Sequence, residues 1–496
     1  MNGEPDLRIG GQWRHASDGG TREIINPADG SVAAVVDEAT SDDARAAVAA
    51  ARKAFDDGVW PATPVGERAA LLDRIADLLQ RDKEDLASLE TRDTGKTLVE
   101  SRIDIDDVTS VFRYYSRLVG IESDRLVDVG DPTVISRVVR EPIGVCVLIA
   151  PWNYPLLQMS WKIAPALAAG CTMVAKPSEV TPLTTIAFMH LLDEAGVPPS
   201  VVNLVQGSGA VLGAALTDNP DVDFISFTGG LATGRTIAKV AAEHVTKVAV
   251  ELGGKNPHIV FADIRTGDDW DSAVDHVLTG VFLHSGQVCS AGTRLIVEEQ
   301  IADDFVAELA ARAEKIRIGN GMDPASETGP LVSEQHRAKV EAHVQQGISD
   351  GAKLVTGGTR PSDPALAKGS FYLPTIFDRC DRSMRIVQEE TFGPILTVER
   401  FTTEAEAITL GNDTEYGLAA GVRTSDPARG ERVVRALRHG TVWLNDFGYY
   451  TAAAEWGGFG KSGNGRELGP TGLAEYQEIK HIWHNTAPQP AGWFKG

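Results

Sequence analysis

Short apolar runs alternate with helical patterns through the first half of the chain. "GVCVLIA" (144–150) is a continuous apolar run of strand length, and "MSWKIAPALAAG" after it has the apolar spacing of a helix that ends at Gly170. "PLTTIAFMHLLDEAG" (182–196) predicts another helix, with Pro182 in its first turn and Gly196 just past its end. The alternation continues to about residue 257 and predicts a parallel, doubly wound sheet with helices on both faces.

A second alternating series follows after residue 258. It includes a helix pattern in "DSAVDHVLTGVFLHS", a strand pattern in "TRLIVEEQ" and later strands in "ILTVERF", "GLAAGVRT" and "GTVWLN". Before the first series and near the C-terminus lie segments of another kind. "DPTVISRVVREPIG" (131–144) is β-branched and alternating, and we expect it to pair with "LAEYQEIKHIWHN" as an edge element of the type used between subunits.

These patterns predict an α/β protein with two doubly wound domains and a small β oligomerisation element. Residues 1–128 and 147–257 are expected to form one domain, and residues 258–446 the other. Residues 129–146 and 470–490 are expected to form the oligomerisation element.

Composition narrows the class of partner. The chain has 496 residues, 43% of them hydrophobic and 23% charged, and a net charge of −22, which disfavours nucleic acids and anionic membranes as partners. The first residues lack a signal-peptide pattern, and no apolar run is long enough to span a bilayer. The four cysteines are far apart and show no CxxC spacing, so we expect neither a disulfide framework nor a metal site, and a cytoplasmic protein.

Three stretches carry candidate chemistry. Cys289 lies among small residues in "GQVCSAG", which leaves room for a thiol to attack a substrate, although free cysteines are commonly packing residues. Glu251 closes a strand in "VELGGKNP", where a carboxylate can act as a general base or merely cap or pair. Asn153 in "APWNYP" can donate to a developing oxyanion or serve as a turn residue. Together they form the set expected of an acyl-transfer site.

The sequence resembles a known family in several motifs. "PWNYP", "KPSE", "FTGG", "ELGGKNP", "GQVCSAGTR", "EETFGPIL" and "WGGFGKSGNGRELG" occur in the order typical of the NAD(P)-dependent aldehyde dehydrogenase superfamily. The resemblance implies that Cys289 attacks the aldehyde carbon while the Asn153 side chain and the Cys289 backbone N–H hold the oxyanion. A hydride then leaves for the nicotinamide, and Glu251 activates the water that hydrolyses the thioester.

The resemblance also implies NAD as cofactor, in preference to NADP. Lys176, Ser178 and Glu179 in "KPSE" match the segment that holds the adenine ribose, and the Glu179 carboxylate would oppose a 2′-phosphate. In "EETFGP", Glu390 matches a ligand of the nicotinamide ribose, and Phe392 would pack near the nicotinamide ring.

Glycines would bring the backbone close to the cofactor. Gly207, Gly209 and Gly213 form a G-x-G-x-x-x-G pattern, which departs from the standard Rossmann fingerprint in the manner of this family. Gly229 and Gly230 open the next helix in "FTGG", where the family usually has serine in place of Gly230. The helix N-terminus would still present backbone N–H groups to the pyrophosphate.

For the substrate, the sharper resemblance is to betaine aldehyde dehydrogenases and related ω-aminoaldehyde enzymes. Their cationic substrates suit an aromatic cage, and Tyr154, Trp161 and Trp456 match cage positions. Glu455 would add a negative charge beside the cage. Plant members often have an aromatic residue six positions before the cysteine, where this chain has Leu283, so neutral aliphatic or aromatic aldehydes and other aminoaldehydes stay open as alternatives.

Two further expectations follow from the same residues. Tyr449 and Tyr450 in "NDFGYYTAAAEW" are candidate substitutes for the missing aromatic residue. The family and the pairing segments imply a homo-oligomer, a dimer or a tetramer. A non-catalytic binding or structural protein of the same fold is the alternative of another class, and the presence of Cys289, Glu251 and Asn153 argues against it.

Overall fold

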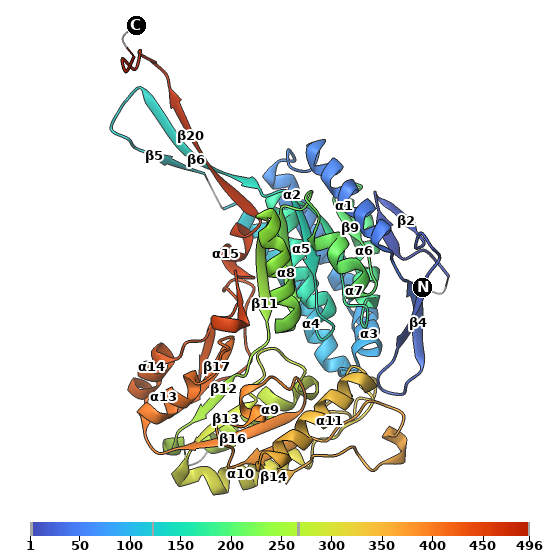
Figure 1. The fold of residues 1–496 in the computed structure, drawn as a ribbon, viewed down its shortest axis with the longest axis vertical. Helices are drawn as coiled ribbons and strands as arrows, with labels where there is room; N and C mark the ends of the chain where they lie inside the picture. Colours follow the sequence, from blue (N-terminus) through green and yellow to red (C-terminus); the bar gives the residue numbers. More distant parts are fainter. Residues whose placement is uncertain (1–2, 122–123, 265–267, 495–496) are drawn as a thin grey trace.

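Two large β-sheets organise the molecule, each in its own layered body (Figure 1). The computed structural model describes residues 3–121, 124–264 and 268–494. The first sheet has eight strands in the order β19-β11-β10-β7-β8-β9-β1-β2. Its strands are β1 (Leu7–Ile9), β2 (Gln12–Arg14), β7 (Val145–Ile149), β8 (Thr172–Lys176), β9 (Val202–Leu204), β10 (Phe224–Gly229), β11 (Lys247–Leu252) and β19 (Gly463–Asn464).

Strands β7 to β11 pair in parallel, and helices cover both faces of this sheet, as the alternation predicts. Alternate residues of β7 face opposite ways: Cys146 and Leu148 belong to one apolar core, and Val145 and Val147 to the other. The helices of the first core are α2 (Val65–Arg81), α3 (Lys83–Thr94), α4 (Leu98–Val119), α5 (Pro155–Ala169) and α6 (Leu183–Ala195). The helices of the second core are α1 (Ser41–Asp56), α7 (Gly209–Thr217) and α8 (Leu231–His244).

The second sheet has seven strands in the order β14-β15-β16-β13-β12-β17-β18, all parallel except β14. Its strands are β12 (Pro257–Val260), β13 (Arg294–Glu298), β14 (Lys353–Thr356), β15 (Thr375–Asp378), β16 (Ile395–Phe401), β17 (Ala419–Arg423) and β18 (Thr441–Leu444). The helices around it are α9 (Asp268–Phe282), α10 (Glu299–Ala313), α11 (Glu334–Ser349), α12 (Arg385–Gln388), α13 (Glu404–Asn412) and α14 (Pro427–Ala436). The predicted α/β class with two doubly wound sheets is therefore confirmed.

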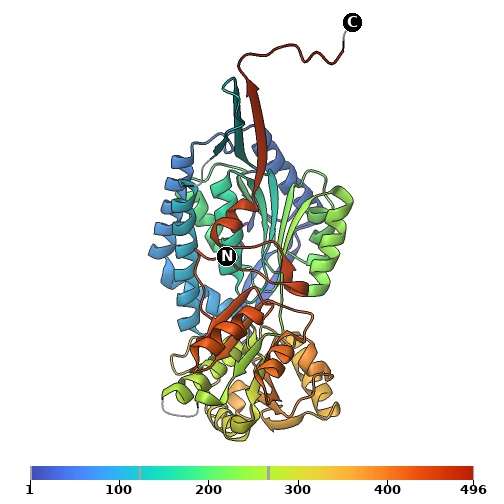
Figure 2. The ribbon, with the colours of Figure 1, turned by 90° about the vertical axis from the view of Figure 1, so that its left-hand side faces the viewer.

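Two small sheets complete the fold. β3 (Thr21–Ile25) pairs with β4 (Val32–Asp37), and β20 (Gln477–Asn485) pairs with β6 (Val134–Pro142), which also pairs with β5 (Arg125–Val127). The predicted pairing of the segment at 131–144 with the C-terminal segment is confirmed. The three-stranded sheet β20-β6-β5 projects from the body as an arm in both views (Figures 1 and 2).

Some local details differ from the patterns. Pro182 is the N-cap of α6 and not part of its first turn. The Gly-rich segment after β9 folds as α7, because its alanines and leucines supply the apolar face that packs against the sheet. Within the described ranges, no helix combines the length and hydropathy that a membrane crossing requires.

Candidate active site

The three candidate catalytic residues face one cavity between the two sheets. Asn153 follows β7, and Glu251 lies near the end of β11. β10 pairs in parallel with both strands, so their carboxyl ends lie on the same edge of the sheet. Cys289 comes from the loop between α9 and β13 of the other body. The cavity has a volume of about 640 Å³, and Asn153, Glu251 and Cys289 all line it.

Backbone contacts fix the loop that carries Cys289. Asn256 Nδ2 donates to the carbonyl oxygens of Cys289 at 2.9 Å and Ala291 at 3.0 Å. Asn153 Nδ2 donates to Gln287 O at 2.8 Å, so the amide of the predicted oxyanion donor is held against the cysteine loop. Gly286 has φ +71°, and a Cβ there would lie 2.1 Å from Gly393 O, so only glycine fits.

Burial sets the protonation of the two reacting groups. It raises the pKa of the Cys289 thiol to about 12, and the nearby Glu390 and Glu251 add to the effect. Burial, followed by the charge of Glu467, raises the pKa of the Glu251 carboxyl well above 4.5. Both carboxyl oxygens of Glu251 are buried without a hydrogen-bond partner in the part of the chain that the structure describes. Burial therefore favours the neutral, protonated form of both groups.

A buried ion pair lies near Glu251. Lys162 Nζ, from α5, pairs with the Glu467 carboxylate and donates to Thr228 Oγ1 at 2.7 Å and to Ser226 Oγ at 3.1 Å. Lys162 lowers the pKa of Glu251, whereas Glu467 raises it. Sequence reasoning missed this pair, because no local pattern links Lys162 to a residue 305 positions away.

The residues predicted to face the pyrophosphate and the nicotinamide end share the cavity with Cys289. Gly229, Gly230, Glu390 and Phe392 all line it. Glu390 accepts from Gly254 N at 3.0 Å, and burial raises its pKa to about 7. Phe392 has φ +57° and meets the Trp152 ring edge-to-face at 5.2 Å between centroids.

The cavity lining also includes residues that sequence reasoning missed. These are His336, Lys339 and His343 of α11, at helical spacing of three and four. His336 Nε2 lies 2.8 Å from Phe392 O. This polar face was visible in the sequence as an i, i+3, i+7 set, but nothing there distinguished it from a solvated helix face.

The predicted adenine-side residues lie apart from this cavity. Lys176 Nζ is 3.6 Å from Glu179 Oε2, and burial lowers the pKa of Lys176. Glu179 lines a second cavity of about 490 Å³. Ser178 Oγ accepts from Val180 N at 3.3 Å and so stabilises the local turn. Gly209 begins α7, and Gly213 lies within that helix; a Cβ at either would meet nothing within 4 Å.

Three aromatic rings meet beside the catalytic cavity. The Trp161 centroid lies 5.4 Å from Tyr450 and 5.9 Å from Trp456, and Tyr450 and Trp456 are 5.8 Å apart. We call these three residues the aromatic cluster. Tyr450 Oη donates to Asp107 Oδ2 at 2.6 Å, and burial raises the pKa of Asp107. Trp456 also lines the catalytic cavity.

The other predicted substrate residues are placed differently. The Tyr154 ring has the Lys96 Nζ 4.0 Å from its centroid and the His284 ring 5.5 Å away, so two protein groups already occupy its surroundings. Glu455 is exposed, and its carboxylate accepts from Thr471 Oγ1 at 2.9 Å. Leu283 is 40% exposed and Tyr449 71%.

The chain is similar in sequence to known proteins of one family. A family model described as the aldehyde dehydrogenase family matches residues 13–482. Betaine aldehyde dehydrogenase of Bacillus subtilis (strain 168) is 55% identical over 488 residues, which are 98% of this chain and 99% of that protein. Peroxisomal aminoaldehyde dehydrogenase 1 of Pisum sativum is 42% identical over 495 residues, which are 99% of this chain and 97% of that protein.

Solved structures give the same picture. A crystal structure of betaine aldehyde dehydrogenase from Staphylococcus aureus in complex with NAD+ superposes with a TM-score of 0.97 at 48% identity, and the match covers 99% of this chain and 96% of that chain. In an apo crystal structure of a point mutant of that protein, with a TM-score of 0.97 at 48% identity covering 99% of this chain and 97% of that one, Cys289 is modified by β-mercaptoethanol.

Proposed function

The chain belongs to the aldehyde dehydrogenase family and oxidises an aldehyde with NAD, and we propose that its substrate is betaine aldehyde, which it converts to glycine betaine. The main support for the reaction is that Cys289, Asn153 and Glu251 line the same cavity. The betaine aldehyde dehydrogenases of Bacillus and Staphylococcus, similar over nearly their full lengths, support the substrate.

The residues around the cavity fit a bound dinucleotide. A Cβ at Gly230, the N-cap of α8, would meet nothing within 4 Å, so the backbone there is open to an approaching phosphate. Glu390 and Phe392 would hold the nicotinamide end, while Lys176 and Glu179 would hold the adenine ribose. The Glu179 carboxylate favours NAD over NADP. When bound, NAD supplies the hydride acceptor.

The chain's own groups perform the addition. The thiol is protonated at neutral pH because burial raises its pKa to about 12. The Glu251 carboxylate shares the cavity and has the raised pKa of a good proton acceptor, so it takes the thiol proton, directly or through water. The Cys289 sulfur then forms a bond to the aldehyde carbon. Asn153 Nδ2 and the Cys289 N–H donate to the resulting oxyanion.

Hydrolysis uses the same residues. Loss of hydride from the thiohemiacetal leaves a thioester on Cys289. Once the thiol proton has passed from Glu251 to solvent, Glu251 accepts a proton from water as the water oxygen bonds to the thioester carbon. The carbon–sulfur bond breaks to give the Cys289 thiolate and the carboxylic acid, which loses its proton to solvent. The Lys162–Glu467 pair lies close enough to bias the Glu251 charge in both steps.

The aromatic cluster is the proposed site for the trimethylammonium group. Trp161, Tyr450 and Trp456 present three rings with centroids within 6 Å of one another, and Asp107 lies behind Tyr450. A cation is attracted to such ring faces. Tyr154 contributes less directly, because Lys96 already lies 4.0 Å from its ring centroid.

The test is a steady-state comparison of aldehydes with NAD and NADP, followed by nicotinamide absorbance. We expect kcat/KM for betaine aldehyde to exceed that for hexanal, and NAD to be preferred. A higher kcat/KM for hexanal would refute the cationic substrate, and no NADH with any aldehyde would refute the catalytic function.

We further infer that one body binds the cofactor and the other supplies the nucleophile. Residues 1–128 and 147–257 hold NAD, and residues 258–446 supply Cys289. The predicted oligomerisation element, residues 129–146 and 470–490, contains strands β6 and β20 of the arm and pairs subunits in a dimer or tetramer. Its exposed Ile479 (70%) and Trp483 (57%) support this. The four free cysteines agree with a cytoplasmic enzyme.

A further inference from the structure

The loop that leads to Cys289 begins with an unfavourable backbone. His284 has φ +48°, Ser285 φ +53° and Gly286 φ +71°, so three consecutive residues adopt left-handed conformations. For residues other than glycine this region is uncommon, and it persists where surrounding contacts hold it. We call residues 284–286 the left-handed turn. Gly286 suits it, whereas His284 and Ser285 need an anchor.

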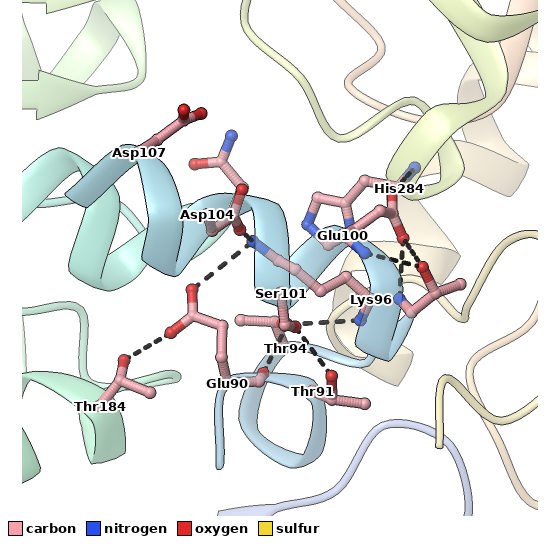
Figure 3. Close-up of polar contacts among 12 residues, drawn as sticks. Glu90, Thr91, Thr94, Lys96, Glu100, Ser101, Asp104, Asp107, Thr184 and His284 are labelled. Atoms are coloured by element: carbon pink, nitrogen blue, oxygen red, sulfur yellow. Dashed lines mark hydrogen bonds and ion pairs between the residues drawn. The ribbon is translucent and has the colours of Figure 1, made fainter. Parts of the chain in front are cut away.

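A buried carboxylate from the other body anchors His284, whereas Ser285 donates from its backbone N to Thr328 Oγ1 at 3.0 Å. Glu100 Oε1 accepts from the His284 backbone N at 2.8 Å. Glu100 Oε2 accepts from the N and Oγ1 of Thr97, both at 2.7 Å, in the capping box that begins α4. Figure 3 shows Glu100 on this helix with the His284 segment against it. Glu100 is 8% exposed, so no solvent competes strongly for these bonds.

The cluster around Glu100 is also fixed. Lys96 Nζ lies 2.6 Å from Asp104 Oδ2 and 3.5 Å from Glu90 Oε1, and all of these groups are buried (Figure 3). Lys96 also faces the Tyr154 ring, which in turn meets the His284 ring edge-to-face. The anchor is therefore part of a buried cluster at the start of α4, in which the Lys96 ammonium faces the carboxyls of Glu90, Glu100 and Asp104.

The turn connects this cluster to both oxyanion donors. Gln287 donates from its backbone N at 3.1 Å and from Nε2 at 3.0 Å to His284 O. The carbonyl of Gln287 accepts from Asn153 Nδ2, and Cys289 follows two residues later. A shift at His284 would therefore move the thiol, its backbone N–H and the Asn153 amide together.

We propose that Glu100 is a positioning residue for catalysis: it holds the left-handed turn in place and so fixes Cys289 and Asn153 relative to each other. The inference rests on the proposed function, since it takes these two residues as the reacting groups. Small displacements of reacting groups cost large factors in rate, so this contact matters although Glu100 does not line the cavity.

The experiment compares Glu100→Ala with Glu90→Ala in the full-length protein. Both remove a buried carboxylate beside Lys96, but Glu90 accepts from Thr184 Oγ1 and does not bond the turn. Two readouts are measured: hydrogen exchange of the backbone amides of 284–289, and kcat with KM for NAD and betaine aldehyde. Glu100→Gln keeps the volume and one acceptor oxygen, which guards against misfolding of the alanine variant.

For Glu100→Ala we expect about tenfold or faster exchange at 284–289 and a loss of kcat of roughly tenfold to a hundredfold. KM for NAD should change little, Glu100→Gln should be intermediate, and Glu90→Ala should match wild type in both readouts. Unchanged exchange, unchanged kcat despite faster exchange, or equal damage from Glu90→Ala each overturns the proposal. If wild type makes no NADH while Glu100→Ala exchanges faster, the proposed function fails and the anchoring contact stands.

Discussion

The loop around Cys289 and the aromatic cluster lie beside each other but are held by different forces. Directional hydrogen bonds from Asn153 and Asn256 fix the loop at 2.8–3.0 Å. Ring packing at 5.4–5.9 Å between centroids holds Trp161, Tyr450 and Trp456. Hydrogen bonds constrain direction, whereas ring contacts tolerate adjustment. Under the proposed function, we expect the loop to set the rate of the chemistry and the cluster to set the choice of aldehyde.

The strongest way to break this comparison is to remove the nucleophile. Cys289→Ala should lower kcat on the order of 10⁴-fold or more, because no other group in the cavity can form the thioester. NADH formation is the measurement. Cys380→Ala is the matched control, because this cysteine packs against an apolar core of the second body. The control variant should keep wild-type turnover. Retained turnover in Cys289→Ala would show that another group attacks the aldehyde.

Removal of the base is the next largest effect. Glu251→Gln should lower kcat by roughly 10²–10⁴-fold. Because burial raises the pKa of Glu251 well above 4.5, its deprotonated fraction grows with pH. Wild-type kcat should therefore still rise with pH above the range in which an ordinary carboxyl has lost its proton, and Glu251→Gln should lose this rise. A kcat–pH profile measures both; an identical profile in the variant would exclude Glu251 as the base.

Removal of the oxyanion donor tests the role of the hydrogen bonds that hold the loop around Cys289. Asn153→Ala should lower kcat by about 10²–10³-fold, the usual consequence of losing one such donor. It also frees the carbonyl of Gln287, so hydrogen exchange of the loop should be measured beside turnover. A change in KM for the aldehyde with wild-type kcat would instead place Asn153 in substrate binding.

The catalytic residues and the aromatic cluster also differ in how much of them the sequence predicts. Asn153 and Glu251 stand in short motifs after strands that apolar runs identify, so the α/β class and the common edge of these two residues were predictable. Cys289 lies before β13 of the other body, so its approach to that edge depends on tertiary packing. The aromatic cluster was predicted only in part. Tyr450 meets Asp107, which is 343 positions away, and such contacts depend on tertiary packing that no local pattern encodes.

The same limit applies to the supporting charges. Glu100 forms a capping box that "TLVE" encodes, yet its bond to the backbone of His284 joins residues 184 positions apart. Ser178 shows the converse: it lies within a matching motif, but its hydroxyl accepts from Val180 N. Its role toward the cofactor stays a prediction.

A change in the cluster should alter the choice of aldehyde more than the rate. Trp161→Ala should raise KM for betaine aldehyde about thirtyfold, since a desolvated cation–π contact is worth about 2 kcal/mol. KM for hexanal, which has no cation, should change much less, so the ratio of the two kcat/KM values is the measurement. An equal loss for both aldehydes would mean that Trp161 supports the fold of the pocket and does not select the cation.

The smallest expected effect is that of Glu455, which lies next to the aromatic cluster in sequence. Glu455 adjoins Trp456, and its charge was predicted to assist a cationic substrate. In the structure its exposed carboxylate accepts from Thr471 Oγ1 at 2.9 Å, and solvent screens a charge in such a position. Glu455→Gln should therefore change kcat/KM for betaine aldehyde by less than about twofold. A tenfold loss that disappears at high salt would show that the cluster extends to Glu455 and that long-range charge, besides ring packing, selects the substrate.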